Sequence, residues 1–160
     1  MVCAASVGAD STPAATRCLR TSRPSRGAAA ISLGLERQLR LGDLAARRDW
    51  GFAGDYVRAM WLMLQAEEPD DYVVASGEAH TAEEFVAAAF EHVGLDWRDY
   101  VRHDDSLSRG ASDSPELVGD PTKIRERLGW EPEVRFDELV GMLVDADLAA
   151  LKAQAAASAR

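Results

Sequence analysis

The sequence predicts several helices but only two short strands, and this imbalance restricts the fold more than any other feature. Strands that alternate with helices normally build a parallel sheet, and such a sheet needs more strands than this chain supplies. The 160 residues are enough for one ordinary domain. We therefore predict an α/β chain that is mostly helical with short strands and that forms part of a larger fold.

Five segments have the hydrophobic periodicity or the capping residues of helices. They cover residues from about 28 to 35, 55–67, 82–93, 121–128, and from about 136 onwards. The third has the strongest signals, because Thr81 and Glu84 form a capping-box pattern and Gly94 provides a C-cap. The fifth fades into an Ala-rich tail after Leu151.

The two predicted strands are short and lie between these helices. One is Arg40–Leu41, which ends at Gly42, and the other is Asp71–Ala75, which Gly77 stops. Two strands of this length cannot form an independent sheet.

The charge of the chain is divided unevenly. Residues 1–48 carry eight arginines and three acidic side chains, a net charge of +5, whereas residues 49–160 carry −14. The total of −9 disfavours nucleic acid as the main partner. No apolar run approaches the roughly 20 residues that a transmembrane helix needs, so we expect no membrane partner either.

Residues 1–26 are predicted to be a disordered head, followed by a folded region over 27–150 and a tail over 151–160. The head is rich in Ala, Ser, Thr and Arg and has too little apolar mass to offset the entropy of ordering. Both cysteines, Cys3 and Cys18, lie in it, which indicates a reducing compartment. An Arg- and Ser-rich start resembles an organelle transit peptide. The alternative is a non-native head from a misplaced start or a reading-frame error.

The usual catalytic motifs do not occur in the sequence. Gly51 and Gly54 are the only candidates for a dinucleotide loop, but they follow no predicted strand and are interpreted as packing glycines at a helix start. No Tyr-x-x-x-Lys, Walker loop or nucleophile elbow is present. The three histidines are twelve and eleven residues apart, which does not suit a metal site.

Two arginines are candidates for binding an anion. Arg48 lies just before a predicted helix, whose free N–H groups favour negative charge. Arg109 lies in a polar loop over 106–114. If both face one cleft, they form a clamp for a diphosphate, because guanidinium binds phosphate with two parallel hydrogen bonds. The alternatives are a surface ion pair of Arg48 with Asp49 or Asp55, and a solvated linker around Arg109.

Four runs of residues resemble one enzyme family in order and in spacing. They are LGDLAARRDWGFAGDYV at 41–57, DDYVVASGEAHT at 70–81, LVGDPTK at 117–123 and LGWEP at 128–132. Together they closely resemble the GDP-mannose 4,6-dehydratases. The resemblance covers about Gly27 to Leu148, and no part of it extends into residues 1–26, which favours the non-native interpretation of the head.

The resemblance implies an extended short-chain dehydrogenase fold. Members of this family have an N-terminal Rossmann domain that binds NADP and a smaller C-terminal part that binds GDP-mannose, which they convert to GDP-4-keto-6-deoxymannose and water. This chain resembles only the C-terminal substrate-binding part, with the N-terminal Rossmann core missing. We therefore expect no catalytic, cofactor-binding or metal-binding residue in it, and no dehydratase activity from the chain alone.

The resemblance also assigns the substrate contacts. Arg48 and Arg109 would bind the GDP diphosphate, with the backbone of Leu41 and Gly42 beside the nucleotide. The family is cytoplasmic and forms homo-oligomers, which we do not expect this chain to reproduce. Two alternatives stay open: a binding-only or interaction module that pairs with a full-length enzyme, and a different sugar-nucleotide dehydratase or epimerase.

Overall fold

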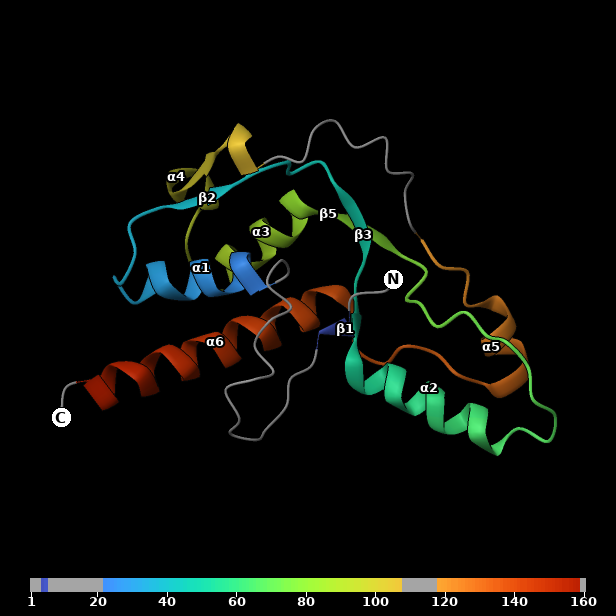
Figure 1. The fold of residues 1–160 in the computed structure, drawn as a ribbon. Helices are drawn as coiled ribbons and strands as arrows, with labels where there is room; N and C mark the ends of the chain where they lie inside the picture. The colour runs from blue at the N-terminus through green and yellow to red at the C-terminus, as the bar shows by residue number, and fades with distance from the viewer. Residues whose placement is uncertain (1–3, 6–21, 108–117, 159–160) are drawn as a thin grey trace.

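The computed structural model describes residues 4–5, 22–107 and 118–158, and its elements are mostly helical (Figure 1). In chain order they are β1 (Ala4–Ala5), α1 (Ser22–Ser32), β2 (Leu39–Leu41), β3 (Arg47–Asp49), β4 (Gly51–Phe52), α2 (Ala53–Gln65), β5 (Ala79–Thr81), α3 (Ala82–His92), α4 (Trp97–Tyr100), β6 (Val101–His103), the 3₁₀ turn η1 (Asp105–Leu107), α5 (Thr122–Leu128) and α6 (Phe136–Ser158). Among the described residues, no helix combines the length and the hydrophobicity that crossing a bilayer requires.

The main core lies where α1, α3 and α6 pack against one another, with β2 and β6 beside them (Figure 1). Its buried residues are Ala28, Ile31, Leu39, Leu41, Phe85, Val86, Ala89, Phe90, Val101, Val140 and Val144. The predicted periodicities of α3 and α6 are thereby confirmed, because their apolar faces meet each other in this core.

A second cluster joins α2 to α5 at the other end of the molecule (Figure 1). Its buried residues are Tyr56, Ala59, Ile124 and Trp130. The indole nitrogen of the fully buried Trp130 donates to the backbone oxygen of Asp55 (2.9 Å). The buried Asp55 carboxylate accepts the amides of Glu133 (3.0 Å) and Val134 (3.1 Å), so the chain after α5 is fastened to the first turn of α2.

The strands form three separate two-stranded ladders. β1 pairs with β4 and β2 with β6 in parallel, whereas β3 and β5 are antiparallel. Leu39 lies opposite Val101 in the second ladder, and Arg48 lies opposite His80 in the third. The short strands agree with the predicted fold class.

The capping box of α3 is confirmed and glycines end both α3 and α5, whereas α5 begins one residue later than expected, at Thr122, without a side-chain cap from its N-cap residue. The Glu84 amide donates to Thr81 Oγ1 (3.0 Å), and the Thr81 amide donates to Glu84 Oε2 (2.7 Å). Gly94 and Gly129, which follow α3 and α5, have φ of +74° and +64°, the left-handed conformation that favours glycine at a helix end.

The first helix begins earlier than predicted. α1 starts at Ser22, so the expected boundary at residue 26 falls inside a helix. Pro24 is tolerated because it lies in the first turn, where its missing N–H has no helical partner. Ser25 is fully buried and its hydroxyl donates to Asp147 of α6 (2.8 Å). This tertiary contact, which hydrophobic periodicity does not reveal, orders the start of α1.

Two further predictions were wrong. Asp71–Ala75 is not a strand, because no other segment of the described chain offers it a ladder of backbone hydrogen bonds. The Ala-rich tail does not leave the helix after Leu151: α6 continues to Ser158, and Leu151 itself is buried against Ala29 and Ala30. Alanine has the highest helix propensity, so the tail extends a helix that packing has already formed.

Candidate functional site

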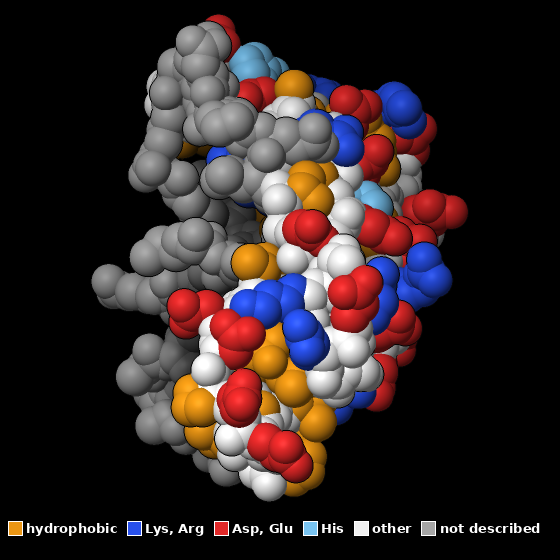
Figure 2. All heavy atoms as spheres, turned by 90° about the vertical axis from the view of Figure 1, so that its right-hand side faces the viewer, with side chains coloured by type: hydrophobic (Ala, Val, Ile, Leu, Met, Phe, Trp, Pro, Cys, Tyr) orange, Lys and Arg blue, Asp and Glu red, His pale blue; other side chains and the backbone are white. Residues whose placement is uncertain are grey.

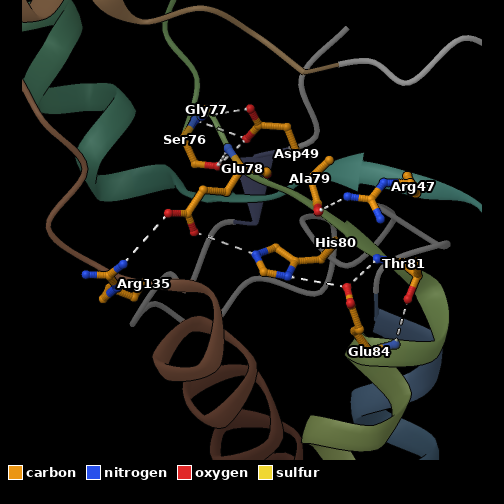
Figure 3. A network of polar contacts seen from close by, with 10 residues as sticks. All are labelled: Arg47, Asp49, Ser76, Gly77, Glu78, Ala79, His80, Thr81, Glu84 and Arg135. Carbon is orange, nitrogen blue, oxygen red and sulfur yellow. Dashed lines mark hydrogen bonds and ion pairs between the residues drawn. The ribbon is translucent and has the colours of Figure 1, made fainter.

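The strand β3 holds two neighbouring arginines in different surroundings. Residues of a strand point alternately to its two sides, so Arg47 and Asp49 share one side while Arg48 occupies the other. Arg47 donates from Nη2 to the backbone oxygen of Ala79 in β5 (2.8 Å) (Figure 3). Its guanidinium therefore reinforces the strand pairing.

The Asp49 carboxylate is buried and is surrounded by donors. Oδ1 accepts the Ser76 amide (3.0 Å) and the Ser76 hydroxyl (2.6 Å). Oδ2 accepts the amides of Gly77 (3.1 Å) and Gly119 (3.4 Å). One side chain thus joins β3 to the turn before β5 and to the chain just before α5, and Figure 3 shows the first of these links.

Two glycines allow the backbone to approach this carboxylate. Gly77 has φ of +81°, which a side chain would strain. A Cβ at Gly119 would clash with the side chain of Ala75. Glycine at these two positions therefore lets the backbone amides reach the Asp49 carboxylate.

Arg48 is exposed and has no carboxylate partner among the described residues. Its Nη1 donates to the backbone oxygen of Arg47 (2.6 Å), and the other guanidinium nitrogens are left for solvent or a ligand. The predicted alternative, an ion pair with Asp49 or Asp55, does not form. Asp49 is occupied by the donors described above, and the ion pair of Asp55 is with Arg58 (3.5 Å).

The helix start beyond Arg48 is not stabilised by a side-chain cap. α2 begins at Ala53, and its N-cap residue Phe52 offers no hydrogen bond from its side chain. The nearby glycines serve packing, as predicted: a Cβ at Gly51 would clash with the Tyr56 hydroxyl, and one at Gly54 with the Phe52 ring. The space that a dinucleotide phosphate would need beside Gly51 is filled by Tyr56. These residues do not fit NADP.

Tyr56 is unusual among the buried groups. Its side chain is buried, and its hydroxyl has no hydrogen-bond partner in the described part of the chain. Burial, together with the nearby negative charges of Asp49 and Asp55, raises the pKa of Tyr56 to about 12. The phenol therefore stays protonated at neutral pH.

His80, which lies opposite Arg48, connects β5 to both α3 and α6 (Figure 3). Its ring stacks on Phe136 at the start of α6, with centroids 3.7 Å apart. Its nitrogens face Glu84 (3.4 Å) and Glu78 (3.8 Å). The hydrogen bond from the Thr81 amide, with smaller effects of His80 and Arg47, holds the pKa of Glu84 below its usual value. His80, the residue opposite Arg48, is therefore held by its own strand β5 and by contacts with α3 and α6.

Leu41 and Gly42 lie at the C-terminal end of β2, beside β6. The backbone oxygen of Leu41 accepts the Asp104 amide (2.8 Å), and that of Gly42 faces His103 Nδ1 (3.1 Å). The other ring nitrogen of His103 faces Asp105 (2.8 Å). The Asp105 carboxylate and the Gly42 oxygen raise the pKa of His103, because both accept a hydrogen bond from its charged form.

A cavity of about 470 Å³ opens at this end of the β2–β6 pair. Its lining residues are Gln38, Arg40, Arg102, His103, Asp104, Asp105 and Ser106. Arg40 and Arg102 did not feature among the predicted site residues. Ligands of α/β folds bind outside the C-terminal ends of parallel strands, and that rule would have found them had β6 been predicted.

A larger cavity of about 650 Å³ runs along α3 and α4. Three glutamates, Glu83, Glu84 and Glu91, and Asp96 contribute to its lining, against one arginine. Such a lining repels a diphosphate. Size alone therefore does not identify the anion site.

The structure places the predicted site residues on adjoining segments. Residues 42–46 connect β2 to β3, and α3 holds this connection through hydrogen bonds from the Ala82 and Glu83 amides to Ala46 and Leu44 (both 2.9 Å). Arg48 is not among the lining residues of the smaller cavity. The prediction for Arg109 lies outside the described residues.

Comparisons with known proteins identify the family. The sequence model of the GDP-mannose 4,6 dehydratases matches residues 9–143. The chain is 54% identical over 128 residues to GDP-mannose 4,6 dehydratase 2 of Arabidopsis thaliana and 40% identical over 146 residues to the GDP-mannose 4,6 dehydratase of Homo sapiens, in both cases over 80% of its own length. The chain belongs to the GDP-mannose 4,6-dehydratase family.

The chain spans only part of these dehydratases: 34% of the Arabidopsis protein and 39% of the human one. The match of the family model begins at residue 9, within the region predicted as a head that resembles no family sequence. Ser22–Arg26, the first turns of α1, thus lie within the matched region.

Solved structures show which fold the dehydratase segment has. One similar structure is RMD from Pseudomonas aeruginosa complexed with NADPH, with a TM-score of 0.73 and 20% identity over 81% of this chain and 42% of that one. Another is a dTDP-glucose 4,6-dehydratase from Bacillus anthracis in complex with NAD, with a TM-score of 0.62 and 20% identity over 74% and 36% of the two chains. The chain therefore has part of the extended short-chain dehydrogenase fold.

Proposed function

We propose that this chain forms the GDP-mannose-binding part of a GDP-mannose 4,6-dehydratase. The observation that carries the proposal is Arg48, which a dehydratase-family chain holds at the surface of a paired strand and whose guanidinium makes one hydrogen bond, to the Arg47 backbone, among residues 22–107 and 118–158. A guanidinium in that state is suited to bind a diphosphate.

The proposed binding roles are those that the family resemblance assigns to these residues. Arg48 and Arg109 bind the two phosphates, and the backbone of Leu41 and Gly42 lies beside the nucleotide. The cavity next to Gly42, with Arg40 in its lining, supports this location for the nucleotide end of the substrate. We take the binding part to be residues 27–150 together with the first turn of α1.

The redox chemistry belongs to the part of the family proteins that this chain does not span. NADP would supply a hydride acceptor and donor there, whereas Gly51 and Gly54 of this chain serve packing. We further propose that the complete protein acts in the cytoplasm as a homo-oligomer. The conversion it performs is GDP-mannose to GDP-4-keto-6-deoxymannose and water.

The binding role is tested with the purified 160-residue chain. Isothermal titration calorimetry with GDP-mannose is expected to show binding that free GDP competes for. Arg48→Lys keeps the charge but loses the planar fork, and should weaken binding by about 5- to 150-fold, equivalent to 1–3 kcal/mol. Arg47→Lys is the matched control, because the Arg47 guanidinium is engaged with Ala79. Equal losses in both variants would contradict a specific role for Arg48.

The catalytic division is tested by activity. The chain with GDP-mannose and NADP should give no 4-keto product, whereas a chimera that carries it in place of the matching segment of the Arabidopsis dehydratase should be active. Product from the chain alone would overturn this division.

A second candidate function is an interaction module that pairs with a full-length dehydratase. It is favoured by large apolar side chains that α2 leaves exposed, including Trp61 and Leu64. Size-exclusion chromatography of the chain mixed with the Arabidopsis protein distinguishes it: a stable mixed complex without GDP-mannose binding by the chain would favour the module.

A further inference from the structure

We propose that Asp49 is a positioning residue for Arg48: its buried carboxylate fixes β3 so that the neighbouring guanidinium is presented to the diphosphate of the substrate. This inference rests on the proposed function of Arg48. It assigns to Asp49 no contact with the substrate.

The first observation is the direction of the two side chains. Arg48 and Asp49 are consecutive in a strand, so they point to opposite sides. Asp49 is 8% exposed and lies inside, whereas Arg48 lies outside. The carboxylate therefore cannot neutralise the arginine, although the two residues are neighbours in the sequence.

The second observation is the number and the origin of the donors on Asp49. Ser76, Gly77 and Gly119 lie 27, 28 and 70 residues away and come from two separate segments. Hydrogen bonds to a charged acceptor are stronger than those between neutral groups. These contacts hold β3 on the face of the strand opposite to the Arg48 side chain.

The third observation is the shortness of the ladder that Asp49 supports. β3 and β5 pair over three residues only, with Arg47, Arg48 and Asp49 opposite Thr81, His80 and Ala79. A two-stranded ribbon of this length has little stability by itself. The geometry of Arg48 therefore depends on contacts beyond the ladder, and the four hydrogen bonds on the Asp49 carboxylate supply them.

The central variant is Asp49→Asn in the 160-residue chain. An asparagine keeps one oxygen but turns an NH₂ group toward donors, so part of the network is lost. We expect the affinity for GDP, measured by calorimetry with GDP itself, to fall about tenfold, the size of effect that the loss of one hydrogen bond to a charged group can produce. The rate of amide exchange at residues 47–49 and 79–81 should rise by a similar factor. Exchange in α3 and α6 should stay unchanged.

A matched control separates positioning from general destabilisation. Asp55 is also a buried carboxylate that accepts two backbone amides, but it fastens α2 to the chain after α5. Asp55→Asn should lower the melting temperature in a similar way while leaving GDP affinity within about twofold, since less than half a kcal/mol is then lost. Equal losses of affinity in the two variants would overturn the inference.

A double-mutant cycle supplies the decisive readout. If Asp49 acts through Arg48, Asp49→Asn should weaken GDP binding of the Arg48→Lys chain by much less than tenfold. Independent losses that multiply would contradict the inference. Should Asp49→Asn not fold, Ser76→Ala removes the 2.6 Å hydroxyl donor to Asp49, together with the contacts of that hydroxyl with the Glu78 backbone (3.2 Å), and should give the same pattern at a smaller size.

The outcomes separate this inference from the proposed function. Loss of affinity in Arg48→Lys but not in Asp49→Asn refutes the positioning role and leaves the proposed function intact. No GDP binding by the unaltered chain, or no effect of Arg48→Lys, refutes the proposed role of Arg48 and the inference with it. Unchanged amide exchange around β3 in Asp49→Asn refutes the positioning role whatever the binding result.

Discussion

The main core and the second cluster are both built mainly from helices, but they differ in how completely the apolar faces of these helices are covered. In the main core the apolar faces of α1, α3 and α6 meet one another. In the second cluster α2 buries only Asp55, Tyr56 and Ala59, while large apolar residues remain outside. Those exposed between 58% and 81% are Val57, Met60, Trp61 and Leu64.

Figure 2 views the molecule from the end that carries α2 and α5, and hydrophobic side chains reach the surface there between charged ones. Monomeric proteins rarely leave contiguous apolar patches without a function. Apolar periodicity therefore predicts that a helix forms, but it does not say whether the same chain provides what covers it. The chain spans 34% of the Arabidopsis dehydratase. Of its two apolar regions, the one around α2 leaves large apolar side chains uncovered.

The largest expected effect tests whether the two regions are independent. Trp130→Ala and Phe90→Ala each empty a fully buried position, one in each region, and should each cost about 3–5 kcal/mol of stability. In hydrogen–deuterium exchange, Trp130→Ala should release the amides of α2 and α5 while those of α3 and α6 stay protected. Uniform release by both variants would show that the chain unfolds as a single unit.

A smaller effect, confined to the second cluster, is expected at high pH. The pKa of Tyr56, about 12, lies above its ordinary value of 10.0, so the folded state keeps the proton after the unfolded state has lost it. Stability should therefore be constant below pH 10 and fall by about 2–3 kcal/mol between pH 10 and 12.

Urea unfolding at several pH values, with Tyr56→Phe as reference, measures this fall. The difference in unfolding free energy between the two proteins should change only above pH 10. A difference that stays constant up to pH 12 would mean that the Tyr56 hydroxyl is solvated.

The smallest expected effect concerns the exposed side of α2. Trp61→Ser and Leu64→Ser change exposed positions, so stability in urea should stay within about 0.5 kcal/mol of the unaltered chain. Binding of the dye ANS should decrease, because less apolar surface is available. A loss comparable with that of Trp130→Ala would show that α2 is covered within the chain.

Features that depend on neighbouring residues were predictable from the sequence. The capping box at Thr81 and the glycine end of α3 at Gly94 need only a few adjacent residues, and both are confirmed. The family, too, follows from local runs of residues. The position of Arg48 before α2 was predicted, whereas the residues that hold its strand in place were not.

Features that depend on distant residues were missed. Residues 71–75 have the composition of a strand but find no ladder partner in the described chain. The start of α1 depends on Asp147, and the role of Asp49 depends on Gly119. For Ser25 and Asp49 the decisive partner lies far away in the sequence, and a local pattern contains no information about it.

The contact of Ser25 with Asp147 also determines the order in which this protein can be assembled. The two residues are 122 positions apart, and a ribosome that adds about 5–20 residues per second needs roughly 6–24 s to travel from one to the other. During that time the buried face of α1, Ala28–Ile31, has been synthesised while α6 does not yet exist. Until α6 has been made, the face of α1 that packs on it stays uncovered in the nascent chain, which makes that chain a substrate for chaperones.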